Sequence, residues 1–219
     1  MNDTLYIAAK APRVGLAKTR LGRAIGHERA VALYAAFLSD LAARFAHAPF
    51  ALGWYITPPD AWPDIAPLVG HVGRGGRVLP QGEGDWTERQ RALFRGAAAR
   101  GEERVILVAS DSPHLTVETV EAAFRELDRH EVVFGPTHDG GYYLIGMRGW
   151  HDVLRGIPMS TRTVLDDIVA RGEEAGLSVG QVEALFDVDE AADLPRLRHI
   201  LAARVDLPAT RAIVATYGL

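Results

Sequence analysis

The chain has 219 residues, of which 48% are apolar and 24% are charged, and its formal net charge is -4. This length fits a single α/β domain, and the negative charge argues against a broad nucleic-acid-binding surface. The absence of cysteine excludes disulfides, thiolate catalysis and zinc–thiolate sites. The amino-terminal segment does not resemble a signal peptide, and no apolar run approaches the roughly 18 residues of a membrane span. We therefore expect a cytoplasmic protein that binds neither nucleic acid nor a membrane.

Short apolar runs alternate with amphipathic stretches along the whole chain. In order, the patterns predict a strand at 5–9, a helix at 27–45, a strand at 50–56, a loop at 70–84, a helix at 86–100, a strand at 105–109, a helix at 116–127, strands at 132–134 and 142–145, a helix at 161–175, a strand near 177–182 and a terminal helical region. This alternation predicts one three-layer α/β/α domain over residues 1–219, with a mostly parallel mixed sheet. Ligands of such sheets bind outside the carboxyl ends of the strands.

A basic loop follows the first predicted strand, with the sequence KAPRVGLAKTRL at residues 10–21. It does not match a Walker A loop, because Gly15 lies three residues before Lys18 and Pro12 stands where a glycine is required. Lys10, Lys18 and Arg20 could instead surround a polyphosphate with positive charge. The alternative interpretation is a solvated basic loop.

Carboxylates follow two later segments. Asp111 comes directly after the buried strand at 105–109, where it is well placed to bind a hard divalent cation, although it could equally cap the turn before Pro113. Asp187 and Asp189 are two residues apart, so in an extended segment they lie on the same side. Two such acids repel each other unless a cation or an arginine lies between them. The alternative is an acidic cluster at a helix N-terminus.

The segment GPTHDGGYY follows the strand at 132–134 and brings Gly140 and Gly141 together. Paired glycines allow the backbone to approach a ligand closely, but Asp139-Gly140 is also a common hairpin turn. No histidine pair has the i, i+4 spacing of a helical zinc site. The chain also lacks a G-x-G-x-x-G after its first strand.

Taken together, these motifs resemble one family. The run K-A-P-x-x-G-x-A-K-T-R-L is followed in order by S-D-S-P-x-L, G-P-x-x-D-G-G-Y-Y-L-I-G, S-T-x-x-V-L and D-V-D-E-x-x-D-L. The chain is thereby identified as a member of the bacterial DUF2064 family, whose members resemble glycosyltransferases of the GT-A fold and include radical-SAM/selenodomain-associated transferases. The resemblance covers residues 6–194 and extends more distantly to nucleotide-diphospho-sugar transferases and guanylyltransferases.

The resemblance implies a role for each group of residues. Lys10, Gly15, Lys18 and Arg20 would hold the base edge and the phosphates of a nucleotide. Asp111 and Asp189 would bind Mg²⁺ or Mn²⁺, with Asp187 as the alternative partner of Asp111. The acceptor or sugar side would be formed by Gly140, Gly141, Tyr142, Ser160 and Thr161. Asp139 and Asp187 are the candidate catalytic bases.

The implied chemistry is transfer from a nucleotide-activated donor to a small-molecule acceptor. In glycosyl transfer the donor is a sugar nucleotide and a nucleoside diphosphate leaves, whereas in nucleotidyl transfer the donor is a nucleoside triphosphate and pyrophosphate leaves. Both reactions need positive charge on the departing phosphates. The family resemblance favours glycosyl transfer. A non-catalytic nucleotide-binding protein is a third alternative, and the sequence leaves a homodimer open.

Overall fold

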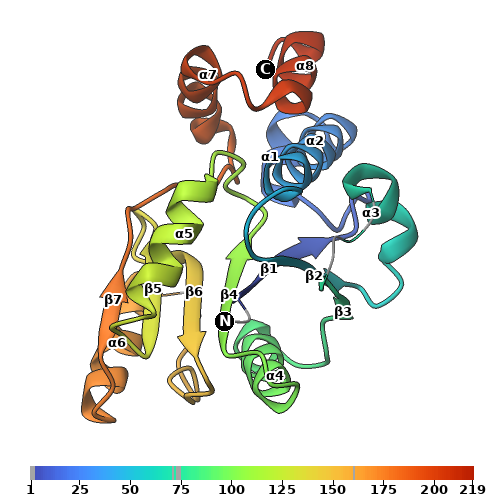
Figure 1. Ribbon diagram of the computed structural model, residues 1–219. Helices are drawn as coiled ribbons and strands as arrows, with labels where there is room; N and C mark the ends of the chain where they lie inside the picture. Colours follow the sequence, from blue (N-terminus) through green and yellow to red (C-terminus); the bar gives the residue numbers. More distant parts are fainter. Residues whose placement is uncertain (1–2, 71, 73–74, 160) are drawn as a thin grey trace.

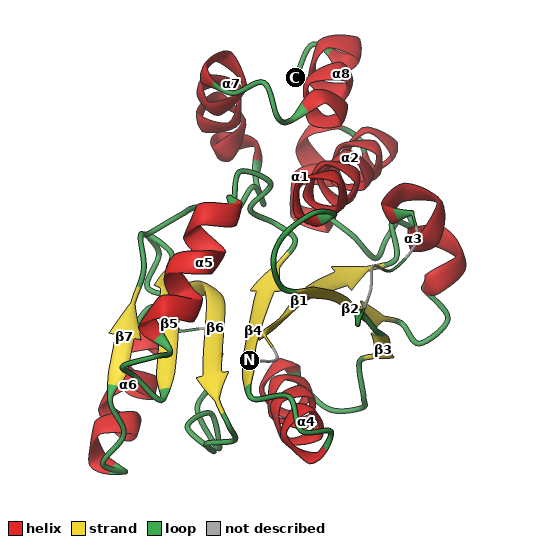
Figure 2. Cartoon of the chain, viewed as in Figure 1, coloured by secondary structure: helices red, strands yellow, loops and turns green. Residues whose placement is uncertain are grey.

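The computed structural model of this protein describes residues 3–70, 72, 75–159 and 161–219. Its central sheet has seven strands (Figures 1 and 2). The strands are β1 (Asp3–Lys10), β2 (Ala51–Thr57), β3 (Val78–Pro80), β4 (Arg104–Ala109), β5 (Val132–Pro136), β6 (Tyr142–Arg148) and β7 (Val179–Gln181). Their order across the sheet is β3-β2-β1-β4-β6-β5-β7. Within these described strands β6 alone runs antiparallel to its neighbours. The prediction of a mostly parallel mixed sheet is confirmed.

Helices cover both faces of this sheet (Figure 2). They are α1 (Thr19–Ile25), α2 (His27–Phe45), α3 (Trp62–Val69), α4 (Trp86–Ala99), α5 (Val117–Glu126), α6 (Val164–Glu174), the short 3₁₀ helix η1 (Ala191–Asp193), α7 (Leu194–Ala203) and α8 (Pro208–Tyr217). No helix in the part of the chain that the structure describes is long and apolar enough to cross a membrane.

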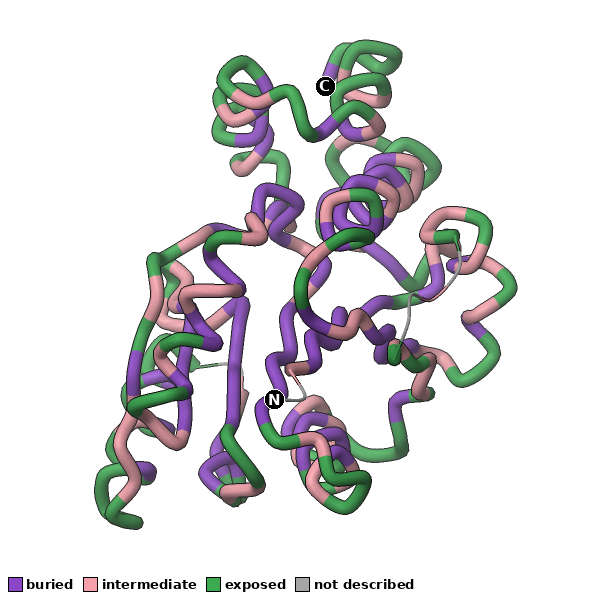
Figure 3. Tube along the Cα trace, viewed as in Figure 1, coloured by how far each residue is buried: buried purple, intermediate pink, exposed green. Residues whose placement is uncertain are grey.

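Two apolar cores result from the alternation of side chains along the central strands. In β1, Leu5 and Ile7 face the core that α2, α3, α5 and α7 cover, while Tyr6 faces the core under α4 and α6. In β4, Ile106 belongs to the first core and Leu107 to the second. Figure 3 shows the central strands and the inner sides of the helices as buried. Each central strand is thus covered on both faces, as its continuous apolar sequence predicts.

The structure differs from the sequence-based prediction in three short elements. Helix α1 begins at Thr19, inside the segment predicted to be a basic loop, and α3 lies where no element was predicted. Strand β3 lies within the predicted loop at 70–84, and it pairs with β2 at the sheet edge. Helix α6 also begins at Val164, three residues later than predicted. The predicted terminal helical region consists of η1, α7 and α8.

The carboxyl ends of β1, β4 and β5 lie on one edge of the sheet, because these strands are mutually parallel. The segment after β7 returns to this edge. A parallel bridge joins Leu185 to Thr137, and the amide of Val188 donates to the carbonyl of Asp111 over 2.9 Å. These contacts bring the loops that follow three strands to the segment 187–189.

Candidate functional site

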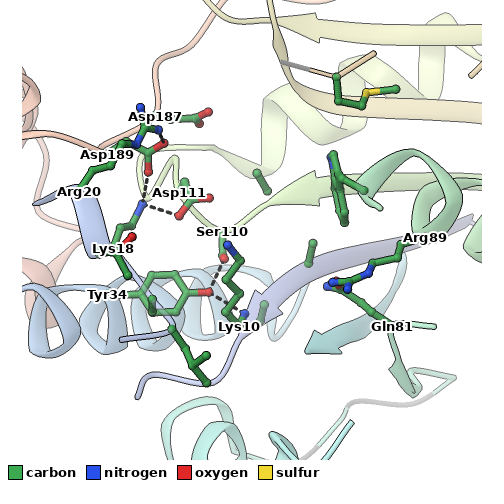
Figure 4. A pocket seen from close by; sticks show the side chains of 18 of the residues that line it. Lys10, Lys18, Arg20, Tyr34, Gln81, Arg89, Ser110, Asp111, Asp187 and Asp189 are labelled. Atoms are coloured by element: carbon green, nitrogen blue, oxygen red, sulfur yellow. Dashed lines mark hydrogen bonds and ion pairs between the residues drawn. The ribbon is translucent and has the colours of Figure 1, made fainter. Parts of the chain in front are cut away.

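A cavity of about 520 Å³ opens at the carboxyl ends of β1 and β4. Charged and polar side chains from six parts of the chain surround it: Lys10, Lys18, Thr19, Arg20, Tyr34, Gln81, Arg89, Ser110, Asp111, Asp187 and Asp189 (Figure 4). Its apolar lining includes Leu16, Trp86, Tyr142 and Met159. The predicted location of the site outside the carboxyl ends of the strands agrees with this cavity.

Lys18 lies at the centre of the charged cluster. Its side chain is 2% exposed, and its ammonium group pairs with Asp111 Oδ1 and, over 3.0 Å, with Asp189 Oδ1. Burial alone would lower the pKa of Lys18, but the charges of Asp111 and Asp189 outweigh it and raise that pKa above its usual value. Lys18 also has left-handed backbone torsions, φ 49° and ψ 41°, which cost energy in any residue that has a Cβ atom.

Asp187 and Asp189 lie on either side of the fully buried Val188 and point away from the core. Asp189 bonds to both Lys18 and Arg20, the latter over 2.6 Å. Although burial opposes it, the positive charge of Lys18 lowers the pKa of Asp189. Asp187 accepts a hydrogen bond of 2.6 Å from Ser112 Oγ. Burial raises the pKa of Asp187 to about 7, and the charge of Asp111 contributes to the increase.

Tyr34 of α2 connects the backbone segments next to this cluster. Its hydroxyl accepts a hydrogen bond from the Lys10 amide over 2.9 Å and lies 2.8 Å from Ser110 Oγ, so it joins the ends of β1 and β4. The Lys18 ammonium is 5.7 Å from the centroid of the Tyr34 ring. The sequence pattern assigned Tyr34 only to the apolar face of a helix, and nothing local indicated its position under the site.

Gln81 and Arg89 form the wall of the cavity opposite this cluster (Figure 4). Gln81 Nε2 donates to the carbonyl of Tyr55 over 2.8 Å, and Arg89 Nε donates to the carbonyl of Gly84 over 3.0 Å. Trp86 begins helix α4 next to them. The sequence-based prediction missed all three, because they follow a three-residue edge strand with little apolar pattern of its own.

A second cavity, of about 1110 Å³, adjoins the first. Arg20, Met159, Asp187 and Asp189 line both. The second cavity is otherwise formed by Thr137, His138, Asp139, Gly140, Gly141, Thr161, Arg162, Val164, Phe186, Glu190, Asp193 and Arg196. The two carboxylates of the 187–189 segment therefore stand at the junction between two spaces.

Gly140 fixes one side of the second cavity. Its φ is +90°, and a Cβ atom there would lie 1.8 Å from the carbonyl oxygen of Arg162. The Leu165 amide donates to the Gly140 carbonyl over 3.2 Å. Only glycine combines this torsion with so close an approach. The glycine pair thus holds the 161–165 segment at the cavity, a role that the hairpin interpretation did not include.

The residues predicted for the site fall into clear groups. Lys10, Lys18, Arg20, Asp111 and Asp189 line the first cavity, as does Tyr142, which was predicted for the acceptor side. Gly140, Gly141, Thr161 and Asp139 line the second cavity, and Asp187, Asp189 and Arg20 line both. Gly15 lines neither and provides a turn with φ +85°. Ser160 lies outside the described residues.

Asp111 and Asp187 offer carboxylate oxygens, the ligands that a hard divalent cation prefers. Magnesium is commonly held by one or two protein carboxylates together with substrate phosphates. Burial and the charge of Asp111 raise the pKa of Asp187, although the nearby Lys18, which pairs with Asp111, opposes the increase. No group of three or more acidic or histidine side chains has the arrangement of a complete metal site within residues 3–70, 72, 75–159 and 161–219. A cation here would therefore need ligands from a substrate.

Solved structures with this fold include nucleotide-dependent transferases. A protein from Desulfovibrio desulfuricans G20, described as a candidate nucleotide-diphospho-sugar transferase, is 28% identical, with a TM-score of 0.86 over 99% of both chains. CMP:2-keto-3-deoxy-manno-octonic acid synthetase complexed with CTP is 14% identical, with a TM-score of 0.58 over 94% of this chain and 100% of the other. A cytidylyltransferase from Leptospira borgpetersenii serovar Hardjo-bovis (strain JB197) is 13% identical, with a TM-score of 0.56 over 99% and 93%. The fold is that of the nucleotide-diphospho-sugar transferases and cytidylyltransferases.

The family of this chain is shown by a match between its residues 42–161 and the protein-family model described as "Uncharacterized protein conserved in bacteria (DUF2064)". The chain belongs to the DUF2064 family, as its motifs predict. No curated protein matches it.

Proposed function

We propose that this protein is a metal-dependent transferase that moves a glycosyl group from a nucleotide-diphospho-sugar to a small-molecule acceptor. The observation that carries the proposal is the buried Lys18 of the first cavity, held between Asp111 and Asp189, of which Asp189 also lines the second cavity. A lysine so placed can exchange a carboxylate partner for a phosphate oxygen when a nucleotide binds. The full-length similarity to the Desulfovibrio desulfuricans protein supports the same donor class.

In the proposed reaction the first cavity binds the donor. The acceptor hydroxyl oxygen attacks the anomeric carbon of the sugar, and the bond from this carbon to the phosphate oxygen breaks. The electron pair of that bond leaves with the nucleoside diphosphate, where Lys10, Lys18 and Arg20 offset the growing negative charge. The acceptor approaches from the second cavity, so the transferred group would lie near Asp187 and Asp189 at the junction.

Asp111 and Asp187 are the proposed ligands of Mg²⁺ or Mn²⁺, which would supply positive charge to the donor phosphates. Asp189 was the other predicted ligand. Both of its oxygens already bond to Lys18 and Arg20, so we assign it to holding these cations in place. Asp139 is then the proposed base. Hydrogen bonding to Thr137 lowers the pKa of Asp139, so it is ionised at neutral pH and can accept the proton of the acceptor hydroxyl.

Nucleotidyl transfer is the second candidate. Its specific support is the sequence after β4, Asp111-Ser112-Pro113, in which the third residue of the Asp-x-Asp motif of many glycosyltransferases is replaced by proline. In this reaction the acceptor oxygen attacks the α-phosphorus of a nucleoside triphosphate, and pyrophosphate leaves. The cytidylyltransferases that share the fold fit this alternative.

A product assay separates the two reactions. The protein is incubated with Mg²⁺ or Mn²⁺, a panel of sugar nucleotides and nucleoside triphosphates, and a mixture of small acceptors, and the products are identified by mass spectrometry. We expect a nucleoside diphosphate from one sugar nucleotide, and loss of that product in Asp111→Asn but not in Asp166→Asn, a control on the exposed side of α6. Release of pyrophosphate would instead establish nucleotidyl transfer. If no donor gives either product, the remaining alternative is a nucleotide-binding protein that is not a catalyst.

A further inference from the structure

The second cavity contains cations that no described residue neutralises. Arg162 and Arg196 both line it, and the side chain of neither has a hydrogen bond or an ion pair with any other residue that the structure describes. Most arginines in the described chain are held differently: Arg13, Arg44, Arg91, Arg104 and Arg204 each contact one or more carboxylates. The two arginines of the second cavity are thus available for a ligand.

Arg196 is held on a platform that leaves its binding groups free. Its guanidinium carbon lies 4.1 Å from the centroid of the Phe186 ring, and the ring centroid of the buried His114 is 4.3 Å from that of Phe186. When a guanidinium group lies over an aromatic ring, its N–H groups point outward in the guanidinium plane. There they can bind an oxyanion with two hydrogen bonds. The stack also reduces the freedom that Arg196 loses when it binds a ligand.

Arg162 is held through its backbone. The contact between its carbonyl and Gly140, together with the bond from the Leu165 amide, fixes the segment on which it lies. Its side chain is exposed at the cavity. The two arginines therefore come from different segments, one before α6 and one in α7, and both segments are anchored.

The acidic residues of the same cavity already have partners. Asp139 accepts hydrogen bonds from Thr137 Oγ1 over 2.5 Å and from the Gly141 amide over 3.2 Å. Asp193 accepts the amides of Asp189 and Glu190, and Glu190 pairs with Arg20 over 2.9 Å. The partners of Asp139 and Asp193 are neutral groups, and neither carboxylate pairs with Arg162 or Arg196, so among the described residues these two arginines of the cavity have no carboxylate partner.

We propose that the second cavity binds an acceptor with an oxyanion group, a carboxylate or a phosphate, through Arg196 and Arg162. This inference rests on the proposed function only in naming the ligand an acceptor. The anion site itself follows from the two arginines, the Phe186 platform and the glycine-anchored segment. A neutral polyol or sugar could accept hydrogen bonds from the guanidinium groups but would leave their charge uncompensated, so anionic acceptors are favoured over their neutral analogues.

Residue-resolved labelling with phenylglyoxal, which attacks guanidinium groups, tests the site without requiring turnover. The full-length protein is labelled in sodium phosphate, sodium acetate or sodium chloride at equal ionic strength, and the rate at each arginine is measured by peptide mass spectrometry. The matched control is Arg23 of α1, which is exposed and lines neither cavity. We expect phosphate, acetate or both to slow labelling of Arg162 and Arg196 by about threefold or more relative to chloride, because a bound oxyanion occupies the attacked N–H groups. Arg23 should react equally in all three salts.

The pattern of protection distinguishes the outcomes. Protection by phosphate alone identifies a phosphorylated acceptor, and stronger protection by acetate identifies a carboxylate. Equal rates at Arg162 and Arg196 in the three salts would overturn the proposal. If protection occurs while the product assay detects no transfer, the proposed function fails and the anion site stands. If transfer to neutral acceptors occurs and the double variant Arg162→Gln, Arg196→Gln does not change it, the proposed function stands and the anion site fails.

Discussion

Replacing the buried His114 with phenylalanine should make the protein less sensitive to mild acid. His114 is 5% exposed, stacks on Phe186, and its Nδ1 atom is buried without a hydrogen-bond partner among the described residues. Burial lowers the pKa of His114 to about 4, and the positive charges of Arg204, Arg44 and Arg196 add to the effect. In the unfolded chain the same imidazole has a pKa of about 6.5.

The difference between these two pKa values sets the magnitude. Above pH 6.5 the ring is neutral in both states, so it adds no pH dependence. Between pH 6.5 and 4 the unfolded chain binds a proton that the folded protein does not, so the free energy of unfolding falls as the pH falls. At 1.36 kcal/mol for each unit, a gap of about 2.5 units corresponds to roughly 3 kcal/mol. Below pH 4 both states are protonated and the loss ends.

Urea denaturation followed by circular dichroism, at several pH values from 7.5 to 4, measures this term. His114→Phe keeps an aromatic ring on Phe186 and removes the proton, so we expect it to lose about 2–3 kcal/mol less than the wild type over this range. The other histidines contribute equally to both proteins and cancel. Parallel pH profiles for the two proteins would refute the reasoning, because they would mean that His114 titrates in the folded protein much as it does in the unfolded chain.

Three further predictions concern the site. Lys18→Met leaves Asp111 and Asp189 without their shared cation and should lower the free energy of unfolding by about 1–3 kcal/mol. The loss should be smaller than for a fully buried pair, because both carboxylates are about one third exposed. A loss below about 0.5 kcal/mol in urea denaturation would contradict this prediction. Gly140→Ala should cost clearly more than Gly149→Ala in thermal unfolding, since both glycines have positive φ but only at Gly140 would the Cβ atom strike a carbonyl oxygen; equal shifts in Tm would disprove the close approach. Asp111→Ala should abolish metal-dependent nucleotide binding in calorimetry with Mg²⁺ or Mn²⁺ while the circular dichroism spectrum stays that of the wild type, and undiminished binding would exclude Asp111 from the metal site.

The elements that the sequence predicted are those with a strong local pattern. Strand β4 contains the continuous apolar run VILVA, and α2 repeats apolar residues at helical spacing over 19 residues. The missed helices lack these patterns. Helix α1 has seven residues and begins with Thr-Arg, and α3 contains Pro63 and Pro67, which are more typical of turns. Packing against neighbouring elements, and not local propensity, fixes such short segments.

The same distinction applies to the site. The place of Asp111 at the cavity was predictable because it follows a buried strand, and that of Asp187 and Asp189 because their spacing puts both carboxylates on one side of an extended segment. The meeting of Lys18 with both Asp111 and Asp189 was not, since nothing in the sequence indicates which side chains of a long chain come together. Arg196 lies in the predicted terminal helical region, where no site residue was predicted, and its guanidinium is positioned by Phe186 from another segment.

The ion pair between Lys18 and Asp189 also orders the events of folding. It joins residues 171 positions apart in the sequence, and the hydrogen bond from Val188 to Asp111 brings the same late segment to the middle of the chain. Closing so long a loop costs chain entropy that only an already assembled sheet can offset. During synthesis the amino-terminal strands and α2 emerge well before Asp187 and Asp189. Until then, Lys18 cannot form its ion pair with Asp189. The first cavity is therefore completed only when the last third of the protein has been made.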